Sequence, residues 1–305
     1  MGKHVIVGGG QVGGQLATQL HEAGHDVTVV TRSGRGPSEV TNVAADASDA
    51  ARLTEIAKGA DALYNCANPA YHRWLTDWPP LSDSLLRTAE DTGAVYVILG
   101  NLYMYAPPTA PMRETDPLEP SMEKAKVRVR MWTDALAAHE AGRARVVEVR
   151  ASDFFGPSAS GQSHLGERFI PRLLAGKTIQ FFGDPGQPHS WTYLPDVARA
   201  LATAAADERA WGRPWHVPTN DPLSAREVAQ HMARVAGVEA PKVVPMPQAV
   251  LSAVGLFQPL VRELKHVRYQ FTAPFIMDSS QFQQTFDQHP TPMDDALLAS
   301  VDRWR

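Results

Sequence analysis

Three glycines near the start of the chain have the spacing of a phosphate-binding turn. Gly8, Gly10 and Gly13 follow a short run of β-forming residues and precede a pattern compatible with a helix. In such a turn the first glycine permits the tight bend, the second lets a pyrophosphate approach the backbone, and the third lets the helix pack closely on the strand. A tight turn needs glycine for steric reasons alone, but its place directly after the first strand favours a dinucleotide site. The residues expected to contact the dinucleotide here are Gly8, Gly10, Gln11, Val12 and Gly13.

The end of the next predicted strand, 26–31, indicates which dinucleotide binds. Sites for NAD place an acidic residue near this strand end for the ribose hydroxyls, whereas sites for NADP place a basic residue there for the 2′-phosphate. This chain has Thr31, Arg32 and Ser33, a cation between two hydroxyls. We therefore expect NADP(H); NAD(H) is the alternative, in which Arg32 is only an exposed residue at the start of a loop.

Two later strand ends offer further cofactor contacts. Asp46 follows a predicted strand at 42–45 and either meets the adenine edge or caps the next helix. Cys66 and Ala67 end the predicted strand 62–67, where small residues pass close to the cofactor. Cys66 is the only cysteine, which excludes an intrachain disulfide and a cysteine-cluster metal site, and no partner for a nucleophilic role is in view.

The elements that must position these residues alternate between strand and helix. Helical patterns at 11–23, 53–58 and 85–90 separate predicted strands, of which the fifth is 95–99. Three successive strand–helix crossovers predict an α/β fold with a doubly wound parallel sheet and helices on both faces. Between the fourth and fifth strands stand Trp74 and Trp78, which either line a ligand site at the carboxyl edge of the sheet or pack in the core.

The composition is that of an ordinary soluble globular protein. Of 305 residues 44% are hydrophobic and 20% are charged, and the formal net charge is −4. The negative net charge and the lack of a Lys/Arg block argue against a nucleic-acid partner. We find no signal-peptide pattern and no stretch of transmembrane length, so we expect a cytoplasmic protein without a membrane partner.

Several motifs in the right order resemble the extended short-chain dehydrogenase/reductase family, the NAD(P)-dependent epimerase/dehydratase group. Besides the glycine turn they are LGNLYMYAPP (99–108), VRASDFFGP (149–157), AGKTIQFFGD (175–184), SWTYLPDVARAL (190–201) and PLSAREVA (222–229). The resemblance implies a Rossmann-type cofactor domain at 1–155 and 178–215 and a small substrate-binding cap at 156–177 and 216–305. It also implies a homodimer formed through helices at 85–90 and 121–141.

The chain departs from this family where the family does its chemistry. The family's catalytic Tyr-x-x-x-Lys pair lies on a helix after the fifth strand, and the lysine lowers the pKa of the tyrosine that exchanges a proton with substrate. If Lys126 is the family lysine, the tyrosine position holds Met122; if Lys124 is, it holds Pro120. We prefer Lys126, which would also bind the ribose hydroxyls. The family's assisting serine falls on Asn101, whose amide cannot relay a proton as a hydroxyl does.

Two interpretations of this departure stay open. In the first, Tyr105, which matches the family's loop tyrosine, or its neighbour Tyr103 supplies the proton; on an extended segment the two would face the same side. In the second, the site binds NADP(H) without turnover, and the protein is a sensor or scaffold.

The substrate side departs as well. Nucleotide-sugar members of the family use an arginine on the diphosphate where this chain has His189, and the asparagine of the sixth-strand signature is Asp153. Both changes argue against a nucleotide-sugar substrate and favour a small carbonyl, alcohol or enone compound, reduced or oxidised with NADP(H). An epimerase or dehydratase that retains its cofactor is a further alternative. The residues expected to contact substrate are Trp74, Trp78, Asp153, Phe154, His189 and Trp191.

Overall fold

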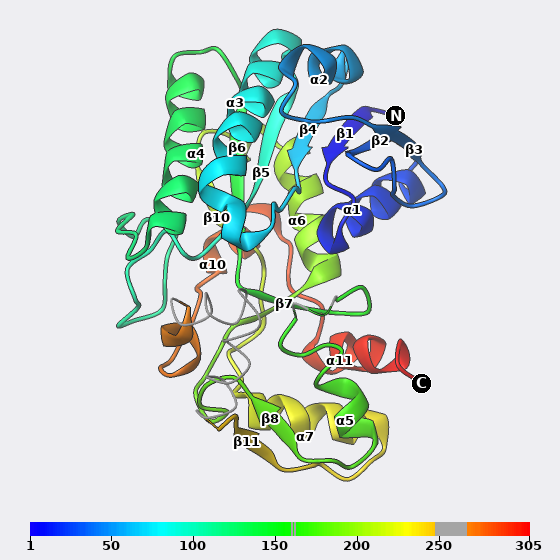
Figure 1. The fold of residues 1–305 in the computed structure, drawn as a ribbon, viewed down its shortest axis with the longest axis vertical. Coiled ribbons are helices and arrows are strands. Elements are labelled where there is room, and N and C mark those ends of the chain that lie inside the picture. The colour runs from blue at the N-terminus through cyan, green and yellow to red at the C-terminus, as the bar shows by residue number, and fades with distance from the viewer. Residues whose placement is uncertain (160, 162, 248–266) are drawn as a thin grey trace. The chain divides into compact units, whose positions relative to one another are not determined.

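The computed structural model describes residues 1–159, 161, 163–247 and 267–305 (Figure 1). They form two compact units, and the chain passes between them several times. Unit 1 comprises Met1–Met104, Pro117–Ala151 and Val197–Val217, and unit 2 comprises Tyr105–Asp116, Ser152–Asp196 and Pro218–Arg305. The segments 105–116, 152–155 and 178–196, which the resemblance assigned to the cofactor domain, therefore group with unit 2.

Unit 1 is built on a seven-stranded parallel sheet with the order β10-β6-β5-β4-β1-β2-β3. Its central strands are buried and rich in valine, isoleucine and leucine, as a sheet covered on both faces requires. The predicted fold class is confirmed. The strands are β1 (Lys3–Val7), β2 (Asp26–Thr31), β3 (Thr41–Ala44), β4 (Ala62–Asn65), β5 (Val95–Asn101), β6 (Val146–Ala151) and β10 (Pro214–His216).

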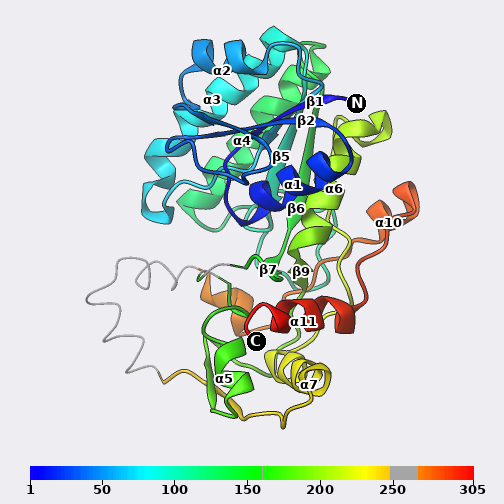
Figure 2. The same ribbon diagram turned by 90° about the vertical axis from the view of Figure 1, so that its right-hand side faces the viewer.

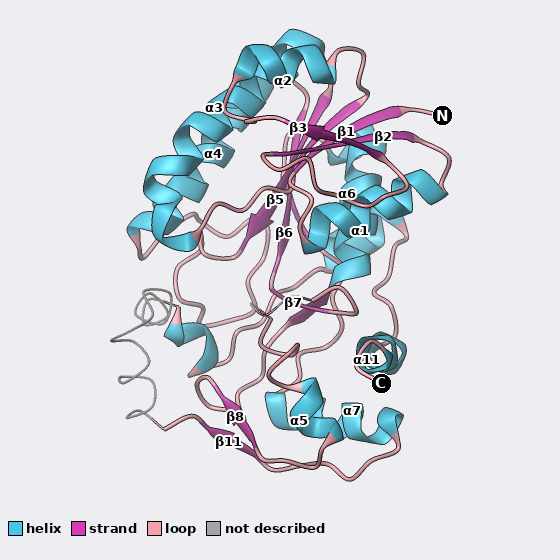
Figure 3. Cartoon of the chain, turned by 45° about the vertical axis from the view of Figure 1, so that its right-hand side comes forward, coloured by secondary structure: helices cyan, strands magenta, loops and turns pink. Residues whose placement is uncertain are grey.

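Helices cover both faces of this sheet (Figures 2 and 3). On one face lie α1 (Gln11–Glu22) and α6 (Leu194–Ala206), and on the other lie α2 (Ala50–Ala57), α3 (Trp74–Thr92) and α4 (Glu123–Glu140). A short 3-10 helix, η2 (Glu208–Ala210), precedes β10.

Helix α3 is longer than the sequence pattern at 85–90 indicated. It begins directly after the 3-10 helix η1 (Tyr71–Arg73) and contains Pro79 and Pro80. Trp74 and Trp78 lie one turn apart in its first half and are both buried, so this half is held by packing rather than by propensity.

Unit 2 holds two small two-stranded sheets and four helices among its described residues. β7 (Asp153–Phe155) pairs with β9 (Trp191–Tyr193), and β8 (Ile179–Phe181) pairs with β11 (Val243–Pro245). The helices are α5 (Ile170–Leu174), α7 (Ala225–Ala236), α10 (Ser280–Phe286) and α11 (Met293–Asp302), with the 3-10 helix η4 (Arg268–Phe271). In the part of the chain that the structure covers, no helix is long and apolar enough to cross a bilayer.

A pair of contacting histidines lies at the amino-terminal ends of β1 and β2. His25 Nδ1 accepts a hydrogen bond from the Gly2 amide at 3.1 Å, so His4 Nε2, also 3.1 Å away, must be the donor in their contact. His4 Nδ1 lies 3.1 Å from the Tyr64 hydroxyl, which donates to it. Burial, and then the neighbouring His25, lower the pKa of His4 to about 4. His4 is therefore held in its neutral form at the edge of the core.

Candidate cofactor and substrate sites

At two positions of the glycine turn in unit 1, the surrounding backbone leaves no room for a side chain. Gly8 has a φ of +103°, and a Cβ there would lie 2.6 Å from both the Ala67 amide nitrogen and the Cys66 carbonyl oxygen. A Cβ on Gly13 would lie 1.8 Å from the Gly8 carbonyl oxygen. These two glycines are thus required by the fold itself. The backbone of Cys66 and Ala67 packs on the turn, as expected of residues that pass close to a bound cofactor.

Gly10 differs from its neighbours, because a Cβ there would meet no heavy atom within 4 Å. It is the N-cap of α1, and no side chain caps the helix from this position. A glycine without a steric need, at the amino end of a helix, leaves room for a phosphate to reach the backbone amides and the positive end of the helix dipole. The turn, which also includes Gln11 and Val12, therefore fits the pyrophosphate of a dinucleotide.

The loop after β2 carries the residues expected to select the cofactor. Arg32 and Ser33 are exposed, and the Thr31 hydroxyl donates to the Arg35 carbonyl oxygen at 3.0 Å. This bond folds the loop back, so that Arg32 and Arg35 are held on one short turn. The turn 31–35 provides two cations and no carboxylate for the ribose end of a dinucleotide, while Glu39, later in the loop, accepts a hydrogen bond from the Thr18 hydroxyl.

Asp46 closes a local turn after β3. Its Oδ1 accepts from the Ser48 hydroxyl at 2.6 Å and from the Ser48 amide at 3.0 Å, while the N-cap of α2 is Asp49. These hydrogen bonds, with a smaller contribution from the charge of Arg32, lower the pKa of Asp46. The alternative that Asp46 caps the next helix is wrong, because Asp49 is the N-cap of α2. A contact between Asp46 and the adenine stays a prediction.

Cys66 is the free cysteine at the end of β4. Its thiol is buried, and burial raises its pKa to about 12. A thiol protonated at neutral pH is a poor nucleophile, so Cys66 contributes to this site through its small size and its backbone.

The residues expected to act on substrate do not lie on one extended segment. The side-chain oxygen of Asn101 accepts from the Tyr103 amide at 3.1 Å and turns the chain at the end of β5. Tyr103 then packs on Trp74 in unit 1, with ring centroids 6.1 Å apart, whereas Tyr105 is 2% exposed and belongs to unit 2. The extended backbone that would place the two phenols on the same side is not present, because the chain turns at Asn101. Their roles as proton donors stay predictions.

The start of α4 separates the two candidate lysines. The Lys126 side chain is 58% exposed, and its Nζ lies 2.6 Å from Glu123 Oε1. Lys124 is half-buried, and its Nζ lies 3.8 Å from the centroid of the Tyr71 ring. Met122 is the N-cap of α4 and has extended backbone, so it precedes the helix. Sequence reasoning assigned no proton-transfer role to Tyr71; the signal available was its place shortly after a strand end.

A buried polar cluster, which sequence reasoning missed, lies under α4. Arg150 Nε donates to Glu148 Oε2 at 2.7 Å, and both side chains are 1% exposed. The guanidinium of Arg128 donates to the Leu99 carbonyl oxygen and lies 4.9 Å from the Trp78 ring. A Cβ on Gly100 would lie 2.8 Å from both the Arg150 side chain and Glu148 Oε1, so this glycine admits the ion pair between β5 and β6. The cluster fixes the carboxyl-terminal end of β5, where Asn101 stands.

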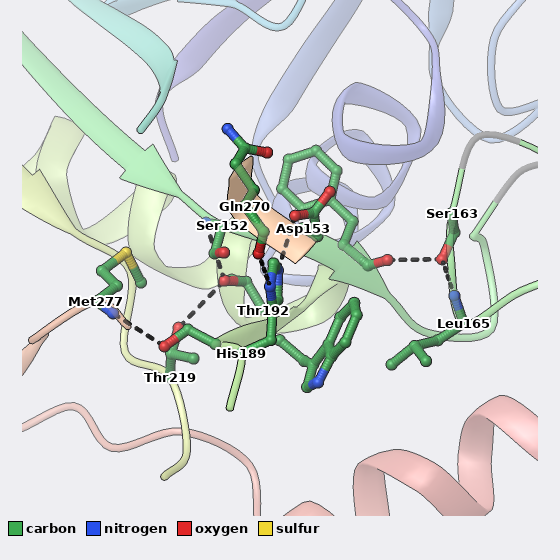
Figure 4. A network of polar contacts seen from close by, with 12 residues as sticks. Ser152, Asp153, Ser163, Leu165, His189, Thr192, Thr219, Gln270 and Met277 are labelled. Atoms are coloured by element: carbon green, nitrogen blue, oxygen red, sulfur yellow. Dashed lines mark hydrogen bonds and ion pairs between the residues drawn. The ribbon is translucent and has the colours of Figure 1, made fainter. Parts of the chain in front are cut away.

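In unit 2 the structure brings together Asp153 and His189, which are 36 residues apart in sequence (Figure 4). His189 Nδ1 donates to the Gln270 carbonyl oxygen at 3.1 Å, and Nε2 lies 2.8 Å from Asp153 Oδ2. One proton is shared between Oδ2 and Nε2. Whichever atom carries it, both ring nitrogens of His189 are engaged, and no N–H is left for a ligand.

Aromatic rings enclose His189, which is 2% exposed. Its centroid lies 4.9 Å from that of Phe271 in a stacked arrangement, 4.3 Å from Trp191 and 5.2 Å from Phe275. Burial opposes ionisation of Asp153, but the hydrogen bond from His189 and the charge of this ring outweigh it and lower the pKa of the carboxyl. The negative charge of Asp153 is therefore balanced within its pair with His189, and its side chain is 25% exposed.

The indole rings expected to contact substrate are core residues in this structure. Trp74 and Trp78 are 4% and 1% exposed in unit 1, and Trp191 is 2% exposed in unit 2, where its Nε1 donates to the Leu223 carbonyl oxygen at 2.8 Å. For Trp74 and Trp78 this is the core-packing alternative, and Trp191 packs in the core of unit 2 in the same way. Phe154 is half-buried, and its carbonyl oxygen accepts from the Ser163 hydroxyl at 2.7 Å.

A doubly wound parallel sheet with a glycine turn at the end of its first strand defines a Rossmann-type dinucleotide-binding protein. The sequence narrows this class further, because the model of the NAD dependent epimerase/dehydratase family matches residues 4–217. The match covers more than half of the chain, and the protein belongs to this family, as its motifs predicted.

Individual relatives agree with this assignment. The chain is 28% identical over 252 residues to a dTDP-6-deoxy-L-talose 4-dehydrogenase (NAD(P)(+)) of Kitasatospora kifunensis, over 77% of this chain and 79% of that protein. It is 27% identical over 135 residues to a dTDP-glucose 4,6-dehydratase of an Actinoplanes species, a match that spans only 42% of that protein and 44% of this chain. A UDP-N-acetylglucosamine 4-epimerase from Methanobrevibacter ruminantium M1 has the same fold, with a TM-score of 0.80 at 16% identity over 99% of this chain and 98% of that chain.

Proposed function

We propose that this protein is an NADP(H)-dependent oxidoreductase that acts on a small carbonyl, alcohol or enone compound without a nucleotide diphosphate. The observation that carries the substrate class is the Asp153–His189 pair. Where nucleotide-sugar members offer donors to phosphate, this chain has a carboxylate and an imidazole whose two nitrogens are already engaged, with Gln270 and with Asp153. With one proton between its two members the pair has no net positive charge to attract a diphosphate, and it leaves a diphosphate without a hydrogen-bond donor from these two residues.

The cofactor preference follows from the loop after β2. Arg32 and Arg35 are exposed on a turn that has no carboxylate to bind ribose hydroxyls. A 2′-phosphate placed there would gain charge-assisted hydrogen bonds that the hydroxyl of NAD cannot match. When bound, the nicotinamide ring supplies or accepts the hydride, and the residues of this chain bind it, orient it and move the proton.

A second candidate is an oxidoreductase or epimerase of a nucleotide sugar. The similarity to the dTDP-6-deoxy-L-talose 4-dehydrogenase, over 79% of that protein, favours it. A third is an NADP(H)-binding sensor without turnover, which the lack of a tyrosine before Lys126 or Lys124 favours.

Calorimetric titration separates these candidates. We expect NADPH to bind more tightly than NADH, and UDP-glucose and dTDP-glucose to give no binding to the NADPH-loaded protein at millimolar concentration. The double variant Asp153→Asn/His189→Arg, which restores the family's donors, should gain affinity for both nucleotide sugars. Tight binding of either by the natural sequence would establish the second candidate. Binding of NADPH without its oxidation by any aldehyde, ketone, quinone or enone in a panel would establish the third.

A further inference from the structure

We propose that Tyr71 is the proton donor of this protein and that Lys124 is the cation that activates it. Together they replace the Tyr-x-x-x-Lys pair that α4 lacks. This inference rests on the proposed oxidoreductase function and adds to it the residue that exchanges a proton with substrate. Three observations within unit 1 carry it.

The first observation is the position of the Lys124 ammonium. Its Nζ lies 3.8 Å from the centroid of the Tyr71 ring, over the π face. A cation there is attracted to the ring and stabilises the phenolate more than the phenol, which makes the hydroxyl a better acid. The neighbouring Lys126 instead forms an ion pair with Glu123 at 2.6 Å on the exposed side of the helix. Of these two lysines, Lys124 is the one that reaches a phenol.

The second observation is the position of the Tyr71 hydroxyl. It donates to the sulfur of Met122 at 3.7 Å. Met122 occupies the family's tyrosine position in the alignment that pairs it with Lys126, and it is the N-cap of α4. The Tyr71 hydroxyl therefore lies next to Met122, the residue at the family's tyrosine position. Tyr71 belongs to η1, whereas the family's tyrosine belongs to the helix that corresponds to α4.

The third observation places Tyr71 at the edge of the sheet where the cofactor turn also lies. β4 ends at Asn65, and the backbone of the next two residues packs against Gly8. The chain then enters η1, which begins at Tyr71. The Tyr71 ring contacts Trp74 with centroids 4.9 Å apart, and Trp74 contacts Tyr103, which follows β5, at 6.1 Å. Tyr71 therefore belongs to the carboxyl-terminal edge of the sheet, where open α/β sheets bind their ligands.

The proton transfer that follows is balanced. In the direction of reduction, a bound reduced nicotinamide cofactor would supply a hydride for the carbonyl carbon. As the π electrons of the C=O bond move to oxygen, Tyr71 would donate its hydroxyl proton to this oxygen. The products are the alcohol, the oxidised cofactor and a phenolate beside the Lys124 ammonium, and water then returns a proton to the phenolate. Oxidation follows the same steps in reverse.

Titration of tyrosine absorbance tests the pair without any substrate. Burial raises the pKa of Tyr64, Tyr96, Tyr193 and Tyr269, four of the seven tyrosines, so these ionise late. The phenolate signal of the natural sequence should show one group that ionises about one pH unit or more below the ordinary tyrosine value of about 10. This group should disappear in Tyr71→Phe and shift upward by about one pH unit in Lys124→Met. The matched control Lys58→Met removes an exposed lysine of the same unit and should leave the titration unchanged.

Each result of this titration decides the proposal. An early-ionising group that persists in Tyr71→Phe, or that disappears in Tyr103→Phe or Tyr105→Phe instead, overturns it. An early group that Lys124→Met and Lys124→Gln both leave unshifted overturns the role of the lysine. In turnover with NADPH and a carbonyl panel, Tyr71→Phe should lower kcat by about a hundredfold or more while the NADPH affinity stays within about twofold. Because the titration needs no turnover, it tests the Tyr71–Lys124 pair even if the proposed oxidoreductase function is wrong.

Discussion

Replacing Gly10 by alanine should weaken cofactor binding without weakening the fold. The backbone of Gly10, with φ −75° and ψ −163°, is open to alanine, and the new methyl group would meet no protein atom within 4 Å. The cost in folding free energy is therefore limited to a poorer N-cap, below about 1 kcal/mol. The methyl would occupy the space through which a pyrophosphate reaches the amides of α1. Loss of one charge-assisted hydrogen bond costs about 2 kcal/mol, which raises the Kd for NADPH about 30-fold.

Two neighbouring glycines are matched controls in the same turn. A Cβ on Gly14 makes only ordinary contacts, the nearest at 3.7 Å from the Gly9 carbonyl oxygen, so Gly14→Ala should keep the affinity and stabilise the helix by about 1 kcal/mol. Gly13→Ala puts a Cβ 1.8 Å from the Gly8 carbonyl oxygen and should lose both stability and binding. The measurements are NADPH titration by fluorescence and urea unfolding of each variant. Gly10→Ala with natural affinity for NADPH, or with the stability loss of Gly13→Ala, would refute the assignment of this space to the cofactor.

Two further predictions concern charge. Arg32→Asp should weaken NADPH by about tenfold or more and NADH by much less, because it places a carboxylate beside the 2′-phosphate; equal weakening in calorimetry would remove the argument for NADP. The pKa of His4 is about 4 in the folded protein and near 6.5 in the unfolded chain, so between these pH values the unfolded chain binds more protons. The free energy of unfolding should therefore fall by about 3 kcal/mol as the pH drops from above 6.5 to 4. Urea unfolding should show a flatter acid profile for His4→Gln and the natural profile for the exposed control His21→Gln; parallel profiles for all three proteins would contradict the neutral histidine.

The cofactor turn could be predicted from sequence because its constraints are local. Gly8 and Gly13 are needed by a bend that is complete within a few residues, and the β-forming and helical patterns around them lie next to it. The parallel sheet followed in the same way from the alternation of strands and helices. The length of α3 was not predicted, because its first half is held by Trp74 and Trp78 in the core rather than by an amphipathic pattern. The short edge strand β10 (Pro214–His216) was not predicted either.

The chemistry could not be predicted in the same way, because it depends on contacts between distant segments. Asp153 and His189 each differ from the family pattern, but sequence alone does not show that they bond to each other at 2.8 Å. Likewise Tyr71 and Lys124 belong to different elements, and only the packing of the start of α4 on η1 brings them together. The turn made by Asn101 is local. It was not predicted, because the rule that residues two apart face the same side, which was applied to Tyr103 and Tyr105, assumes an extended backbone.

The chain crosses between unit 1 and unit 2 five times, and this has a consequence for its synthesis. The glycine turn and the first six strands of the sheet leave the ribosome by residue 151, but the edge strand β10 follows only at Pro214–His216, after β7, β8 and β9 of the other unit. Unit 2 waits longer still, since α11 at Met293–Asp302 packs on α7 and closes its core. A nascent chain can therefore contain the glycine turn and six of the seven strands of the sheet well before unit 2 is complete. Neither unit corresponds to one contiguous fragment that could be expressed alone.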